Sequence, residues 1–153
     1  MSNVNTNFVV KRGVWRFDLL PMKASTAMAE GAAIGIEISG NTTTGNNTLM
    51  GVENASGADF QGILQEPIVS GDADYATAGK LKLVAIPMDQ SAIAEFKVSA
   101  GTFTAADVNK TVEFHSDSLG LAVDTAGKGA RITKYLTASR GECSFVLPTT
   151  ETA

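Results

Sequence analysis

Apolar residues in this chain alternate with polar or small residues at every second position, in short runs interrupted by turn-forming residues. An α-helix would instead bring apolar side chains back every three to four residues, and almost no segment shows that spacing. A two-residue period is the spacing of β-strands with one buried face. Ten segments carry it: 14–20, 34–38, 49–52, 60–64, 81–86, 93–98, 111–115, 119–123, 130–136 and 143–147.

This pattern predicts an all-β fold of about ten short strands: a single-domain β-sandwich or small β-barrel, jelly-roll or tulip-like in form. A length of 153 residues suits one domain with its own core. We expect the β domain over residues 13–148, an extended N-terminal arm over 1–12 and a polar tail over 149–153. Residues 1 to about 7 and residues 148–153 carry too little apolar content to offset the entropy of ordering them.

Two segments are predicted to form short helical turns. In the first, Thr104 can cap the turn and Asp107, three residues later, can reach back as in a capping box. The second candidate is 25–31, where a Ser-Thr start leads through Ala and Met to Gly31.

Within the first predicted strand, Trp15, Phe17 and Leu19 share one face and Arg16 lies on the other. An aromatic residue beside a basic one is also found in nucleic-acid-binding surfaces. Here the alternation separates the two types, so we expect an ordinary half-buried strand.

Charge is unevenly distributed along the chain. Between Lys23 and Lys80 there are seven carboxylates and no Lys or Arg. The segment before it is basic, with Lys11, Arg12, Arg16 and Lys23 against Asp18 alone. This separation predicts one acidic and one basic surface, which favours docking and head-to-tail contact between copies.

Residues suited to catalysis or metal binding are sparse. His115 is the only histidine and Cys143 the only cysteine, and no signature of a thiol nucleophile surrounds either. We expect Cys143 to be a small buried hydrophobic residue. Asp72 and Asp74 resemble half of a calcium loop, but the remaining ligands are missing, so a solvated turn is expected. We predict no enzymatic activity, no metal and no cofactor.

The net charge of −4 argues against nucleic acid as a partner. No segment is long and apolar enough to span a membrane, and the first residues do not resemble a secretory signal. The segment 124–129 resembles a phosphate-binding loop only superficially, and a hairpin turn is expected there.

Four segments of the second half, 99–112, 117–121, 126–132 and 141–146, resemble small all-β decoration (cement) proteins of tailed-phage heads. The shared pattern is a turn of the type Ala-Asp-Val-Gly-Lys, a Gly-containing hairpin and a terminal strand. Asn109 stands where the resemblance implies a glycine, and both residue types tolerate a left-handed backbone. The resemblance implies a homotrimer that is made in the host cytoplasm, sits on the capsid surface between capsomers, binds the major capsid protein and stabilises the shell.

For this role the candidate interaction residues are the basic and acidic side chains Lys11, Arg12, Arg16, Lys23, Asp72 and Asp74. Other virion roles are alternatives: a tail-tube subunit, or a head-fibre or adaptor subunit. A carbohydrate-binding module is a further alternative, although one Trp and two Tyr offer few rings to stack on sugars.

Overall fold

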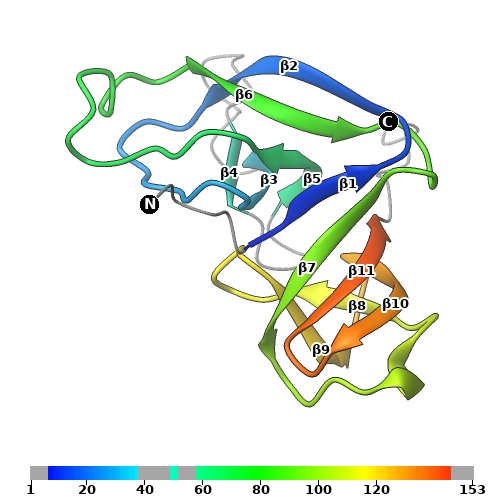
Figure 1. The fold of residues 1–153 in the computed structure, drawn as a ribbon. Helices are drawn as coiled ribbons and strands as arrows, with labels where there is room; N and C mark the ends of the chain where they lie inside the picture. The colour runs from blue at the N-terminus through cyan, green and yellow to red at the C-terminus, as the bar shows by residue number, and fades with distance from the viewer. Residues whose placement is uncertain (1–6, 38–48, 52–57, 146–153) are drawn as a thin grey trace, which may run out of the picture.

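The computed structural model describes residues 7–37, 49–51 and 58–145, and the regular secondary structure of this part of the chain is almost entirely β (Figure 1). The predicted all-β fold is confirmed, as a five-stranded barrel packed against a second sheet. Each predicted strand segment overlaps an observed strand, and one further strand, β1, precedes them. The elements are β1 (Val9–Arg12), β2 (Trp15–Met22), β3 (Ala33–Glu37), β4 (Leu49–Gly51), β5 (Ala58–Leu64), β6 (Lys80–Pro87), β7 (Ile93–Ala100), the 3₁₀ turn η1 (Ala105–Asp107), β8 (Thr111–Phe114), β9 (Leu121–Ala126), β10 (Ala130–Thr137) and β11 (Arg140–Phe145).

The barrel consists of β2, β4, β3, β5 and β6 in that order. Its longest contact is the antiparallel ribbon of β2 and β6, paired from Trp15 opposite Pro87 to Met22 opposite Lys80. On the other edge of β2, β4 is paired only at Met22, opposite Leu49. One edge of β2 is thus paired along its whole length and the other, among the described residues, at one end.

The second sheet has the order β1-β7-β11-β10-β8-β9. Neighbouring strands in that order are antiparallel, and β9 also pairs in parallel with β7. This additional pairing links β9 back to β7, so β1 is the strand added outside the ring. In Figure 1 the β2–β6 ribbon lies at the opposite end of the molecule from β8 to β11.

The core has two parts. The first fills the barrel and includes Met22, Ile34, Leu64, Ile68 and Val84, all at most 1% exposed. The second, larger part joins the barrel to the second sheet.

Phenylalanines form the centre of that second part. Phe60 of the barrel stacks on Phe114 and Phe145 of the sheet, with ring centroids 5.2 Å and 4.7 Å apart. Phe8 meets the same two sheet residues edge-on, at 5.7 Å. The two β-structures therefore share one aromatic core.

The N-terminal boundary differs from the prediction. An arm was expected over residues 1–12, but Phe8 is fully buried and β1 pairs with β7. The reason is that Phe8, directly after the polar residues 1–7, anchors the segment in the core beside Phe114 and Phe145. Gly13, with φ +93°, then turns the chain from the sheet into the barrel, and a Cβ there would lie 1.8 Å from the Ser91 carbonyl oxygen. Residues 1–6 and the predicted tail, 149–153, lie outside the described residues.

One of the two predicted helical turns is confirmed. Thr104 caps η1, and both hydrogen bonds of the capping box with Asp107 are present. Asn109 has the expected left-handed backbone, with φ +80°. The second prediction, a turn of helix over 25–31, is wrong: Met28 instead forms an isolated antiparallel bridge with Ile68 and is buried in the barrel.

Candidate interaction surface

The most conspicuous feature of the described surface is a group of exposed apolar side chains on the β2–β6 ribbon. Phe17, Leu19 and Leu81 are 54%, 53% and 56% exposed. They lie on one face of the ribbon, because Leu19 is paired with Leu83 and side chains two positions apart in a strand point the same way. We call these three residues the β2–β6 apolar face.

The same strand face continues into the core at its other end. Trp15, two residues before Phe17, packs against the core between barrel and sheet, with its ring centroid 6.1 Å from that of Phe145. The prediction that Trp15, Phe17 and Leu19 share a face is consistent with this arrangement, but the expected half-burial is wrong for Phe17 and Leu19. The second sheet covers only the beginning of β2.

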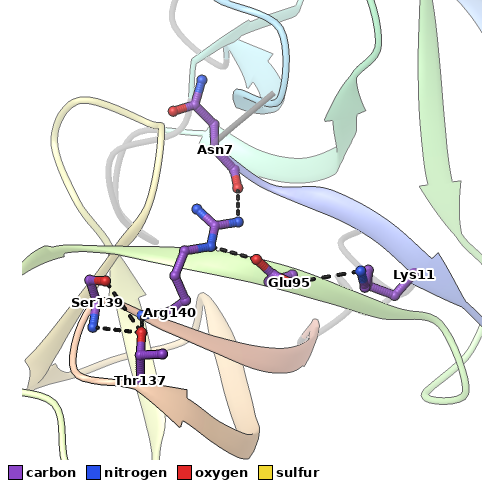
Figure 2. A network of polar contacts seen from close by, with 6 residues as sticks. All are labelled: Asn7, Lys11, Glu95, Thr137, Ser139 and Arg140. Atoms are coloured by element: carbon purple, nitrogen blue, oxygen red, sulfur yellow. Dashed lines mark hydrogen bonds and ion pairs between the residues drawn. The ribbon is translucent and has the colours of Figure 1, made fainter. Parts of the chain in front are cut away.

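Two of the predicted basic interaction residues are engaged within the chain. Arg12 contacts Glu142 at 2.7 Å, and Lys11 lies 3.7 Å from Glu95. Glu95 also accepts a hydrogen bond from Arg140, whose guanidinium donates in addition to the Asn7 carbonyl oxygen (Figure 2). These charges connect β1, β7 and β11.

The Arg12 guanidinium has a clear electrostatic effect on its partner. Its hydrogen bond lowers the pKa of Glu142 below the ordinary value of 4.5, against the effect of burial. The same contact raises the pKa of Arg12. The carboxylate is therefore held in its charged form inside the sheet.

The other two basic candidates lie on or just after β2. Arg16 is exposed, with its Nε 3.9 Å from an Asp18 carboxylate oxygen. The Lys23 backbone N–H donates to the Leu49 carbonyl, and its own carbonyl accepts from the Lys80 ammonium at 3.2 Å. The four basic candidates thus occupy different surroundings.

Asp72 and Asp74 lie in the loop between β5 and β6, and both make contacts within the chain. The Asp72 carboxylate accepts from the Val69 backbone N–H at 3.0 Å, and Asp74 lies 3.3 Å from the Lys82 ammonium. Across the described residues no group of three or more His, Cys, Asp or Glu side chains is placed to hold a metal ion.

The two residues considered as catalytic candidates, Cys143 and His115, lie in different surroundings. Cys143 is fully buried, and burial raises the pKa of its thiol, as expected for a structural cysteine. The His115 Nδ1 atom lies 3.3 Å from an Asp117 carboxylate oxygen, at the start of a turn. Asp117 also borders a cavity of about 440 Å³ whose wall includes Met28 and Leu119, and it is the one carboxylate among the described residues of that lining.

Comparisons with protein-family models, curated proteins and solved structures found no match to this chain. In the part of the chain that the structure describes, no helix has the length and apolar character needed to cross a membrane.

Sequence reasoning did not identify Leu81 or the exposure of its neighbours. The alternation of 81–86 with a two-residue period was visible, as was that of 14–20. Alternation tells which side chains share a face, but not whether another part of the chain covers that face.

Proposed function

We propose that this protein is a structural subunit of the outer surface of a tailed-phage head, where it binds the major capsid protein and stabilises the shell. The observation that supports binding to another protein is the β2–β6 apolar face. Large apolar side chains that gather on a surface mark contact sites, whereas scattered ones are ordinary. The choice of a phage head rests on the resemblance of the four segments in the second half.

In this proposal the apolar face, rather than a basic arm, makes the main contact. Lys11 and Arg12 already pair with Glu95 and Glu142, so using them for the shell would cost intramolecular contacts. Burying exposed apolar side chains stabilises a contact by about 1.5–3 kcal/mol for each fully buried residue. Several linked copies would then bind the lattice tightly through avidity.

The test is occupancy on expanded heads that lack the protein, measured by co-sedimentation. We expect Phe17→Ser combined with Leu19→Ser to weaken binding at least thirtyfold, because two apolar contacts are lost. Val69→Ser is the matched control, since Val69 is 51% exposed but lies in the loop between β5 and β6. Equal occupancy of the double variant and the wild-type protein would overturn the proposal.

The alternatives give different results in the same assay. Binding to purified tail tubes or fibres, and not to heads, would move the protein to another virion site. Binding to glycans that the double variant retains would favour a carbohydrate-binding module.

A further inference from the structure

The backbone of β2 presents hydrogen-bonding groups on the edge away from β6. Leu19 is paired with Leu83, but the Leu83 backbone is used on its other side: its carbonyl accepts from the Gln65 N–H at 2.9 Å and its N–H donates to Glu66 at 2.8 Å. Leu19 and Leu83 are therefore a pair without mutual hydrogen bonds.

Since paired positions alternate along an antiparallel ladder, Trp15, Phe17 and Leu19 all turn their N–H and C=O groups away from β6. The Leu19 N–H donates instead to the Asp18 carboxylate at 2.9 Å. Among the described residues, this edge is paired only at its end, where Met22 lies opposite Leu49. A strand edge that is unpaired over most of its length and lies beside exposed apolar side chains is a template for pairing with another chain.

The charges beside this edge, on Arg16 and Asp18, are complementary to the same two charges on a second copy of the chain. Arg16 and Asp18 flank Phe17, and their side chains are 57% and 52% exposed. If two copies of β2 pair antiparallel about a two-fold axis at Phe17, Arg16 of each copy lies opposite Asp18 of the other. Such opposite charges across a strand pair are stabilising.

We propose that two copies of this chain associate through antiparallel pairing of β2 with β2, centred on Phe17. In this register Phe17 pairs with Phe17 of the second copy, and Trp15 pairs with Leu19. These are the residues whose N–H and C=O groups face the edge, so each such pair forms two hydrogen bonds once the Leu19 N–H exchanges the Asp18 carboxylate for the Trp15 carbonyl of the second copy. Arg16 and Asp18 then form the pairs without mutual hydrogen bonds, in which side chains approach more closely.

Neighbouring registers lack this agreement. Centring the axis on Arg16 or on Asp18 places that charge opposite its own copy, which is destabilising. Centring it on Leu19 leaves Asp18 opposite Leu20. The charge pattern thus selects one register.

The resulting sheet has the order β6-β2-β2-β6. Because the two-fold axis is perpendicular to this sheet, the β2–β6 apolar faces of both copies lie on the same side. This contact does not depend on the proposed capsid role, although it would double the apolar area offered to a shell.

The first experiment measures mass in solution by light scattering, over a range of concentrations. The chain has a mass of 15.9 kDa, and we expect twice that mass at high concentration. Arg16→Asp and Asp18→Arg, made separately, should each weaken the dimer about tenfold or more, because like charges then face each other twice. A trimer or a monomer at every concentration would overturn the inference.

Mixing the two variants is the decisive step. One variant carries two carboxylates at these positions and the other two guanidinium groups, so every cross-strand pair in a mixed dimer is again of opposite sign. We expect the mixture to dimerise at least as well as the wild-type protein. A contact between Arg16 and Asp18 of one chain cannot produce this rescue, and a mixture that stays monomeric would disprove the register.

A cysteine variant tests the two-fold axis directly. In the proposed pair the two Phe17 Cα atoms are about 5.5 Å apart, within the range of a disulfide. Phe17→Cys should therefore form a covalent dimer under mild oxidation, since the natural cysteine, Cys143, is fully buried. Leu81→Cys is the control, equally exposed but on β6, and equal cross-linking of both variants would contradict the geometry. None of these measurements uses a phage head. The dimer can therefore be disproved while the capsid proposal holds, and the capsid proposal can be disproved while the dimer holds.

Discussion

At the scale of single residues, the charges of β1 neutralise two carboxylates that face each other. Glu95 of β7 and Glu142 of β11 are paired across the sheet, and like charges in that position repel. Lys11 and Arg12 lie beside them, and Arg140 also contacts Glu95. The basic N-terminal residues therefore stabilise the chain's own sheet.

Replacing the buried carboxylate tests this interpretation. We expect Glu142→Gln to lose about 1–2 kcal/mol of unfolding free energy at neutral pH, because Arg12 loses a charged hydrogen-bond partner. The pKa of Glu142 is lowered in the folded state, so its contribution is complete above the ordinary value of 4.5 and is lost as the pH falls below it. The variant should therefore lose less stability on acidification than the wild-type protein, as measured by urea unfolding between pH 3 and 7.

Arg12→Ala is the partner variant. If the pair carries the effect, Arg12→Ala should flatten the acid dependence in the same way and should add little to Glu142→Gln in a double variant. Parallel pH profiles for Glu142→Gln and the wild-type protein would contradict the assignment.

At the scale of elements, the sequence predicted those strands and turns that depend on residues close together in the chain. Strand positions followed from alternation, and η1 followed from Thr104 and Asp107, which bond each other three residues apart. The segment 25–31 failed because Met28 pairs with Ile68, forty positions away, which no local pattern reveals. The pairing of Arg12 with Glu142, across 130 positions, was hidden for the same reason. The exposure of Phe17 and Leu19 depends on where the second sheet ends.

The strand missed in the prediction, β1, provides a test at this scale. Phe8 precedes β1 and is fully buried against Phe114 and Phe145. We expect Phe8→Ala to lower the free energy of unfolding by about 3–5 kcal/mol, the usual cost of a buried phenylalanine. Phe17→Ala is the matched control, because Phe17 is exposed, and it should change stability by about 0.5 kcal/mol or less. A Phe8 variant as stable as this control would mean that residues 7–12 form an arm after all.

At the scale of the whole molecule, the barrel and the second sheet depend on one another. The core that joins them takes Phe60 and Ile63 from the barrel and Phe96, Phe114 and Phe145 from the sheet. Without the other, neither the barrel nor the second sheet would keep its share of this core buried. A shared core of this kind favours a single cooperative unfolding transition.

Trp15 allows this cooperativity to be measured. It is the only tryptophan, and it packs on Phe145 where barrel and sheet meet, so its fluorescence reports on that junction. We expect fluorescence and far-ultraviolet circular dichroism to give coincident unfolding curves for the wild-type protein. Phe60→Ala removes the ring that stacks on both Phe114 and Phe145, and it should cost about 3–5 kcal/mol. If the junction is the source of cooperativity, fluorescence should change at a lower denaturant concentration than circular dichroism in this variant. Ile68→Val, inside the barrel, is the control. It should lower the free energy of unfolding by about 1 kcal/mol and keep the two curves coincident. Separate transitions in the wild-type protein would show instead that the two parts fold independently, and that the aromatic core only docks one on the other.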